Sequence, residues 1–152
     1  MDRYTVEDLI PHRGKMKLID KIVDVNPTDR SLTSQVIVTD QDTFFDHSLG
    51  GVPAYVSFEY MAQSISALSA ITDKRRVPKP GVILSVSKLS CTKDIFAEST
   101  EILIQVRESY AVGELFTFDC IASVRGETIV SCTLMVMEIE SLENLAKRKE
   151  GK

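Results

Sequence analysis

The hydrophobic pattern of the chain is unusual between residues 54 and 72. This stretch contains no Gly or Pro, and its large apolar residues are interspersed with Ala and Ser, so that Glu59 is its only charged residue. A helix that is apolar or small on every side is buried on every side. The pattern therefore predicts one long buried helix over Ala54–Thr72.

Alternating apolar and polar positions predict β-strands on both sides of this helix. Residues 16–25 and 32–39 flank a turn at Pro27, which is typical of a hairpin. Four further runs follow the helix with short turns between them, and this order favours an antiparallel meander. These runs are Val82–Ser90, Glu101–Ser109, Glu114–Val124 and Thr128–Ile139.

The sheet is the only large apolar surface available to cover the predicted helix. We therefore expect an α+β fold in which a six-stranded antiparallel sheet wraps around one long central helix. The 152 residues suit a single domain, expected over residues 1–140 and followed by a charged tail over 141–152. Because one such sheet covers only part of a helix, a second protomer is expected to cover the rest.

Charge and composition narrow the function classes. The chain has 22 Asp and Glu against 18 Lys and Arg, and its formal net charge of −4 gives no field that attracts nucleic acid. Its first residues mix charged and apolar side chains, and no apolar run reaches the length of a membrane span. We expect a cytoplasmic protein that neither binds nucleic acid nor spans a membrane.

The cysteines do not have the spacing of a metal or redox site. All three lie within apolar segments without a CxxC pair, and the two histidines, His12 and His47, are distant from them in the sequence. The pattern predicts no metal site, and it predicts reduced core thiols at Cys91, Cys120 and Cys132.

Glu59 and His47 are the candidate catalytic residues. A buried carboxyl group needs a partner, or it holds a proton near neutral pH and acts as a general acid. A structural glutamate, satisfied by a loop at the first helical turn, fits the pattern equally well. His47 lies in the loop before the helix and is a candidate general base, although a lone loop histidine is more often a plain polar residue.

The start of the helix offers a third chemical feature. Pro53 suits a first helical turn, and the N–H groups of Ala54 and Tyr55 are expected to be free at the helix end. Such groups stabilise a developing oxyanion. Every helix has this end, so the feature alone is not specific.

Four motifs follow one another along the chain. They are Ile10-Pro11-His12-Arg13, Leu18-Ile19-Asp20-Lys21, Phe44-Phe45-Asp46-His47 and Glu59-Tyr60-Met61-Ala62-Gln63. Together they resemble the hotdog-fold (3R)-3-hydroxyacyl-acyl-carrier-protein dehydratases over nearly the whole chain. The resemblance implies a hydro-lyase that removes water from a 3-hydroxyacyl thioester, giving the trans-2-enoyl thioester, in fatty acid or aryl polyene-type biosynthesis. It also implies an acyl carrier protein as partner, whose phosphopantetheine arm carries the substrate, and no other cofactor.

The resemblance further implies roles for the matching residues. His47 would take the C2 proton, and protonated Glu59 of the other protomer would protonate the leaving hydroxyl. An N–H near Ala54 or Tyr55 would polarise the thioester carbonyl. This division suits the chemistry, because the C2 proton is acidic only if the carbonyl is polarised and hydroxide leaves poorly unless protonated.

Substrate binding and assembly are implied in the same way. Pro53 matches the family's proline at the helix start, and Gln63 matches the glutamine one turn after the acid. Both are expected to bind substrate, together with Ala54 and Tyr55. The dimer would be a homodimer or a heterodimer with a related hotdog subunit.

The sequence departs from the housekeeping enzymes of this family near the site. The stretch between His47 and Glu59 is shorter, Ser48-Leu49 replaces Phe-Pro, and Ala54 stands in place of Gly. A Cβ at that position narrows the approach of the thioester carbonyl. These departures bear on the substrate more than on the reaction, and they resemble the small dehydratases of bacterial aryl polyene clusters.

Two other functions are compatible with a hotdog chain. A thioesterase would use an acidic residue to activate water and would not require His47, whereas a noncatalytic subunit would only bind acyl chains. A His47→Ala variant separates the dehydratase from the noncatalytic subunit, and release of free thiol identifies the thioesterase.

The remaining polar motifs have simpler interpretations. His12 and Arg13 are expected to fix their loop by hydrogen bonds. A cluster of basic residues is more simply a solvated surface than a docking site for the carrier protein. This cluster contains Lys74, Arg75, Arg76 and Lys79, with Arg13, Lys15 and Lys17 as further candidates.

Overall fold

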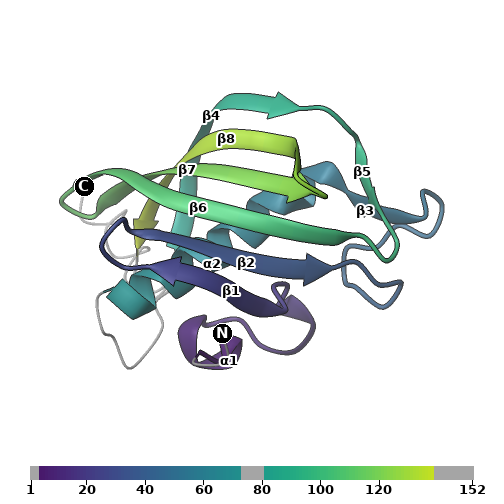
Figure 1. The fold of residues 1–152 in the computed structure, drawn as a ribbon, viewed down its shortest axis with the longest axis horizontal. Helices are drawn as coiled ribbons and strands as arrows, with labels where there is room; N and C mark the ends of the chain where they lie inside the picture. The colour runs from purple at the N-terminus through teal and green to yellow at the C-terminus, as the bar shows by residue number, and fades with distance from the viewer. Residues whose placement is uncertain (1–3, 73–80, 139–152) are drawn as a thin grey trace, which may run out of the picture.

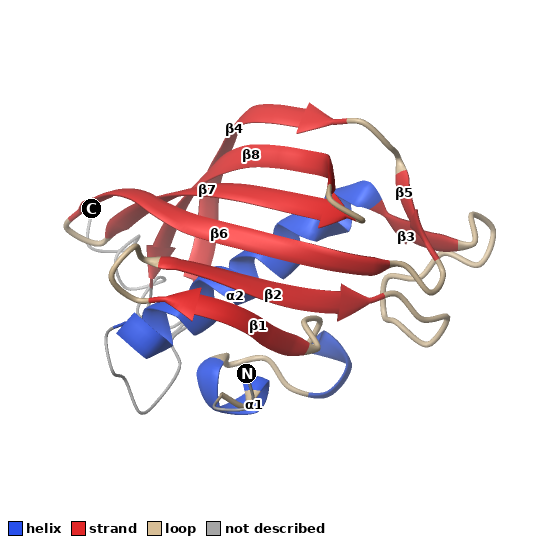
Figure 2. Ribbon diagram, in the orientation of Figure 1, coloured by secondary structure: helices blue, strands red, loops and turns tan. Residues whose placement is uncertain are grey.

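A curved antiparallel sheet wraps around one long helix in the computed structural model, which describes residues 4–72 and 81–138 (Figures 1 and 2). The long helix is α2 (Ser57–Thr72), and a 3-10 turn, η2 (Ala54–Val56), precedes it. It packs against strands β2, β4, β6 and β7. The predicted six-stranded sheet around a central helix is confirmed, although the α-helix itself begins three residues later than expected because Ala54–Val56 form the tighter turn.

The other elements follow in chain order. Two short helical segments, α1 and η1, lie before the first strand, and the six strands of the large sheet have the order β1-β2-β6-β7-β8-β4. Strands β3 and β5 pair separately. The bounds are α1 (Val6–Leu9), η1 (Gly14–Met16), β1 (Lys21–Asn26), β2 (Ser31–Ile37), β3 (Gly51–Pro53), β4 (Gly81–Cys91), β5 (Ile95–Ala97), β6 (Glu101–Val112), β7 (Leu115–Val124) and β8 (Glu127–Glu138).

The order of the strands differs from the predicted meander. Strands β6, β7 and β8 are consecutive neighbours, but β4 pairs with β8, with Val86 opposite Leu134, and not with β6. The segment after β4 includes β5, which pairs with β3 and carries the chain to the start of β6. Strand β4 is therefore one edge of the large sheet, and β1 is the other.

The pairing of β3 with β5 positions the chain just before α2. Gly51 lies opposite Ala97, and a Cβ at Gly51 would collide with the backbone oxygen of Phe96. Glycine is required here because the two backbones approach closely. Phe96 and Val52 are buried beneath this contact, so the start of the helix is fixed to the core.

The core lies between the concave face of the sheet and α2. The buried helix residues Tyr60, Met61, Ile65 and Leu68 belong to one cluster with inward-facing strand residues. One polar contact crosses this interface, where the hydroxyls of Ser34 on β2 and Ser64 on α2 lie 2.7 Å apart. The strand members of the cluster include Leu32, Val36, Ile102, Ile104, Val106, Phe118, Cys120, Leu134 and Val136.

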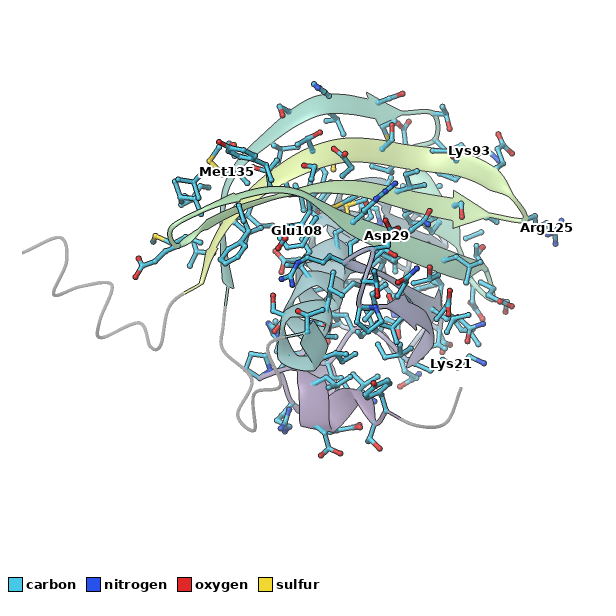
Figure 3. All side chains as sticks on the ribbon, turned by 60° about the vertical axis from the view of Figure 1, so that its left-hand side comes forward. Lys21, Asp29, Lys93, Glu108, Arg125 and Met135 are labelled. Atoms are coloured by element: carbon cyan, nitrogen blue, oxygen red, sulfur yellow. The ribbon has the colours of Figure 1, made fainter. Side chains whose placement is uncertain are left out.

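Ion pairs hold the β1–β2 turn against β6, and Figure 3 labels one residue of each pair, Asp29 and Glu108. Arg107 lies 2.8 Å from Asp29, and the Arg30 guanidinium donates to the Glu108 carboxylate at 3.2 Å. An exposed pair such as Arg107–Asp29 contributes about 0–1 kcal/mol, whereas the Glu108 side chain of the other pair is largely buried. They support the edge hairpin but do not determine the fold.

One face of α2 is left partly uncovered by its own chain. Phe58, Ala62 and Ser66 are half-buried and Glu59 is exposed. Within one chain the sheet therefore covers only part of α2, as expected from the sequence, and coverage of the rest by a second protomer stays a prediction. Among the described residues, no helix is long and apolar enough to cross a membrane.

The thiols are distributed differently from the prediction. Cys120 and Cys132 are buried and reduced, as expected, and they face each other on β7 and β8. Cys91 is exposed at the end of β4, where the strand leaves the sheet, so the prediction of a core thiol there is wrong.

Candidate active site

The loop before β3 presents His47 on a tight turn organised by Asp46. The Asp46 carboxylate accepts hydrogen bonds from the Ser48 amide, at 2.9 Å, and from the Ser48 hydroxyl. The backbone of Asp46 bonds that of Gly51 in both directions, at 2.7 and 3.3 Å. Gly50 closes the turn with a φ of 73°, which favours glycine. These bonds restrict the backbone that carries His47.

The His47 imidazole is exposed and has no hydrogen bond to any described residue. Its ring contacts Phe45 edge to face, with ring centroids 5.0 Å apart. The Ser48 hydroxyl and neighbouring amides hold the pKa of Asp46 below its usual value, so a carboxylate adjoins His47 at neutral pH. The contact with Phe45 thus restricts the orientation of the imidazole, and the exposed ring can still contact a ligand.

The helix start differs from the sequence prediction at Ala54. Its side chain is buried, and its N–H donates to the Asp94 carbonyl at 2.8 Å, so this amide is not free for an oxyanion. Sequence spacing gave no sign of this bond, because Asp94 is far away in the chain and reaches Ala54 through the β3–β5 pairing. The Tyr55 amide has no acceptor among the described residues, and the Tyr55 side chain is 68% exposed.

Pro53 and Glu59 lie on either side of this turn. Pro53 ends β3 in an extended conformation and is partly buried, which directs the chain into the helix. Glu59 lies in the first turn of α2 and is exposed on the uncovered helix face, so the predicted burial of its carboxyl group is not found within one chain. No hydrogen bond or ion pair joins Glu59 to His47 within the described part of the chain.

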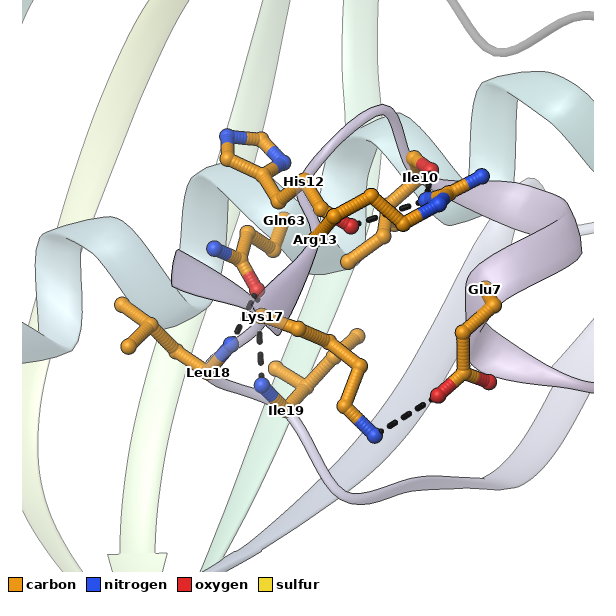
Figure 4. A network of polar contacts seen from close by, with 8 residues as sticks. All are labelled: Glu7, Ile10, His12, Arg13, Lys17, Leu18, Ile19 and Gln63. Carbon is orange, nitrogen blue, oxygen red and sulfur yellow. Dashed lines mark hydrogen bonds and ion pairs between the residues drawn. The ribbon is translucent and has the colours of Figure 1, made fainter. Parts of the chain in front are cut away.

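Gln63, which was predicted to bind substrate, lies in the core beside the segment before β1. It is fully buried, and its Oε1 accepts hydrogen bonds from the amides of Leu18 and Ile19 at 2.8 and 3.3 Å (Figure 4). Its Nε2 donates to the carbonyl of Met16 at 2.6 Å. Both polar ends of the side chain are therefore engaged by backbone, and Gln63 fastens the segment before β1 to the helix.

The motif residues Arg13 and His12 have different environments. The Arg13 guanidinium donates to the carbonyls of Ile10 and His12 at 2.6 and 2.8 Å, which confirms its predicted loop-fixing role. His12 Nδ1 is buried without a hydrogen-bond partner in the described structure, so the predicted loop-fixing bond of this ring is not formed. Burial lowers the pKa of His12, whereas the negative charge of nearby Glu59 opposes this effect.

The charged groups around the site do not form a metal centre. Within residues 4–72 and 81–138, no three His, Cys, Asp or Glu side chains gather so as to hold a metal ion. Lys17 forms an ion pair with Glu7 at 2.9 Å. The basic residues 74–76 and 79, considered as a docking surface, lie outside the described residues.

Solved structures with a similar fold include two kinds of hotdog protein. A chain of "The Dehydratase Heterocomplex ApeI:P from Xenorhabdus doucetiae" aligns with a TM-score of 0.84 and 22% identity, covering 95% of this chain and 97% of that one. A hypothetical thioesterase from Streptococcus pneumoniae, solved with coenzyme A, aligns with a TM-score of 0.59 and 16% identity, covering 80% and 86%. At these identities the likeness shows the fold.

Sequence comparison identifies the family. The 3-hydroxyacyl-[acyl-carrier-protein] dehydratase FabZ of Brucella ovis is 23% identical over 141 residues, covering 90% of this chain and 88% of its own length. FabZ of Bartonella quintana is 23% identical over 146 residues, covering 93% and 94%. The family model for the ApeP-like dehydratases matches residues 4–147. With nearly all of its length matched, the chain belongs to the ApeP-like dehydratase family.

Proposed function

We propose that the protein removes water from a (3R)-3-hydroxyacyl thioester carried on an acyl carrier protein and yields the trans-2-enoyl thioester. The family match and the FabZ relatives support this reaction. The observation that carries the residue assignment is that His47 and Glu59 are both exposed, on a restrained turn and on the uncovered face of α2, without hydrogen-bond partners within the described chain. Such groups are available to a substrate and to a second chain.

The proposed roles divide the elimination into three contributions. His47, as the neutral imidazole, removes the proton from C2. The thioester oxygen gains negative charge in this step. The Ala54 amide is already bonded to the Asp94 carbonyl, so the Tyr55 amide is the donor at the helix start that stabilises this charge. Glu59 delivers its proton to the departing hydroxyl, which leaves as water. Pro53 directs the chain into the turn that carries the Tyr55 amide.

The proposed active assembly contains a second hotdog chain. Strand β4 is an edge of eleven residues with exposed Leu84, Val86 and Leu89, and such an edge is a template for pairing with another strand. Pairing there would extend the sheet and cover the open face of α2. His47 of one chain would then meet Glu59 of the other. The heterocomplex of the Xenorhabdus relative supports either a second copy or a related subunit as the partner.

The substrate follows from the same reasoning. Ala54 is buried at the helix start, and backbone hydrogen bonds between Asp46 and Gly51 close the loop that carries His47. We infer that the acyl chain is of the aryl polyene type, in keeping with the family, and that the phosphopantetheine arm of the carrier supplies the only prosthetic group. The cytoplasmic location expected from the sequence remains a prediction.

The decisive experiment is a dehydration assay on 3-hydroxyacyl carrier-protein thioesters of fatty and aryl type, read by mass spectrometry. Wild type, His47→Ala and Glu59→Gln are compared, each alone and with any copurifying hotdog subunit. We expect loss of one water with wild type, and a decrease in kcat of about 10²–10⁴-fold in each variant, as is typical for loss of a general base or acid.

A matched control is Lys21→Ala, which changes an exposed residue of β1 and should leave the rate unchanged. Undiminished dehydration by His47→Ala would contradict the assignment of the base. Release of free carrier thiol without loss of water would instead identify a thioesterase, the activity named for several hotdog structures of similar fold.

A further inference from the structure

Among the described residues near the site, His12 has a buried polar atom without a hydrogen-bond partner. Its Nδ1 is inaccessible to solvent and makes no hydrogen bond to any described residue. Buried ring nitrogens are normally paired, because desolvation without a hydrogen bond is unfavourable. The unpaired Nδ1 therefore indicates a hydrogen bond that is not formed in the structure of the single chain.

The position of His12 indicates which group completes it. The segment that follows His12 is hydrogen-bonded to Gln63 of α2, which lies one helical turn after Glu59. Gln63 is buried under this segment and Glu59 is exposed, so Glu59 lies where the cover given by the segment ends. In Figure 4 the His12 ring projects on the side of α2 from which Gln63 extends. The nearby Arg13 is occupied with the carbonyls of Ile10 and His12.

The electrostatics of the segment support the same partner. Two charged groups act on His12: Glu59 from α2 favours its protonated form, and Arg13 from its own loop disfavours it. Burial is the largest influence and lowers the pKa of His12, so the ring is neutral at neutral pH. A neutral imidazole has one N–H, which it can carry at Nδ1.

We propose that His12 is a positioning residue for the catalytic acid of its own chain, with His12 Nδ1–H donating to one carboxyl oxygen of Glu59. The other oxygen carries the proton and is thereby aimed at the leaving hydroxyl. When that proton is transferred and water departs, the carboxylate keeps the Nδ1–H bond, which becomes stronger because the acceptor is now charged. No proton leaves His12. The inference rests on the proposed dehydratase function.

The test compares two substitutions at His12 in the active assembly. His12→Phe keeps a ring but removes the donor, whereas His12→Asn keeps an N–H close to the position of Nδ1. We expect kcat to fall by about tenfold or more in His12→Phe, with KM changed less than about twofold, and His12→Asn to recover most of the rate, because the bond strengthens in the transition state. Arg107→Gln, which breaks the exposed ion pair with Asp29 away from the site, should leave kcat unchanged.

A double-mutant cycle separates positioning from a structural effect. If His12 acts through Glu59, then adding His12→Phe to Glu59→Gln lowers the residual rate no further. An equal loss in both backgrounds, an unchanged kcat in His12→Phe, or equal losses in His12→Phe and His12→Asn would each overturn the proposal.

A second readout does not depend on activity. In the ¹⁵N NMR spectrum of the wild-type assembly, His12 should be the Nδ1–H tautomer, and Glu59→Gln should shift its ring nitrogens. If the wild type fails to dehydrate any substrate, the proposed function fails, and these spectra still decide the contact. An Nε2–H tautomer that is insensitive to Glu59→Gln would overturn it.

Discussion

At the scale of single residues, the motif glutamine shows how a side chain near the site can serve the fold. Gln63 satisfies three backbone groups of the segment before β1 from within the core. It lies one turn from Glu59, so the N-terminal segment is bound next to the part of the helix that exposes the acid. Its contribution to the fold can therefore be measured as stability, and its contact with substrate stays a prediction.

Replacing Gln63 by Leu should destabilise the protein. The new side chain has similar volume, but the amides of Leu18 and Ile19 and the carbonyl of Met16 lose their partners, of which the Ile19 bond is fully buried and the other two are partly buried. A buried unsatisfied group costs about 1–3 kcal/mol and a group that water reaches costs less, so we expect the free energy of unfolding to fall by about 2–4 kcal/mol. Urea denaturation measures the change.

The matched control is Gln105→Leu, the same substitution at an exposed position of β6. We expect a change within about 0.5 kcal/mol there. A Gln63→Leu variant as stable as this control would show that the three backbone groups find other partners.

At the scale of elements, the turn that carries His47 depends on an ionised Asp46. Hydrogen bonds from Ser48 lower the pKa of Asp46 in the folded state. A lowered folded-state pKa means that the contribution to stability is present above the unfolded value, about 3.9, and is lost as the pH falls through the folded value. The turn should therefore loosen in acid and hold at neutral pH.

An Asp46→Ala variant should be less stable than wild type near neutral pH, and the difference should shrink as the pH falls below about 4. Because the turn positions His47, kcat should fall as well. Urea unfolding across this pH range measures the first effect. Asp40→Ala, which removes an exposed carboxylate outside this turn, is the control for the loss of one negative charge. A constant difference across the range would contradict the role of the charge.

At the scale of the whole molecule, the open edge at β4 and the open face of α2 indicate an incomplete unit. A double substitution, Val86→Lys with Leu89→Lys, places charges on the exposed part of that edge. We expect association to weaken by about tenfold or more and dehydration to fall in parallel, because charges on an edge strand oppose pairing. Sedimentation velocity over a range of concentrations measures the association.

The comparison variant is Val112→Lys, at an exposed position near the end of β6 and away from the β4 edge. Its association should match that of wild type. Dissociated β4 variants with full activity would contradict the proposal that the site forms between chains.

The sequence predicted the architecture but not all of its connections. The composition of residues 54–72 was enough to indicate the helix, and alternation indicated the longer strands. Strands β3 and β5, of three residues each, are too short to show a period, and the pairing of β4 with β8 joins segments distant in the sequence. The Ala54 amide was misjudged for the same reason, because its acceptor at Asp94 is brought close only by that topology.

The candidate site shows a second limit of sequence reasoning. Glu59 was identified because it is the only charge on an apolar helix, yet one chain leaves it exposed. An apolar pattern reflects every surface that is buried in the active assembly, including surfaces that another chain buries. The pattern therefore does not tell which molecule does the covering.

The hydrogen bond between the hydroxyls of Ser34 and Ser64 has a consequence for the alignment of α2 on the concave face of the sheet. An apolar helix in an apolar groove can slide or rotate with little change in buried area, whereas this bond, 2.7 Å long and fully buried, is satisfied in one alignment only. The bond therefore fixes the alignment of α2 against β2. Ser64 lies little more than one turn beyond Glu59, so the bond also fixes the position of Glu59 along the helix axis relative to the sheet.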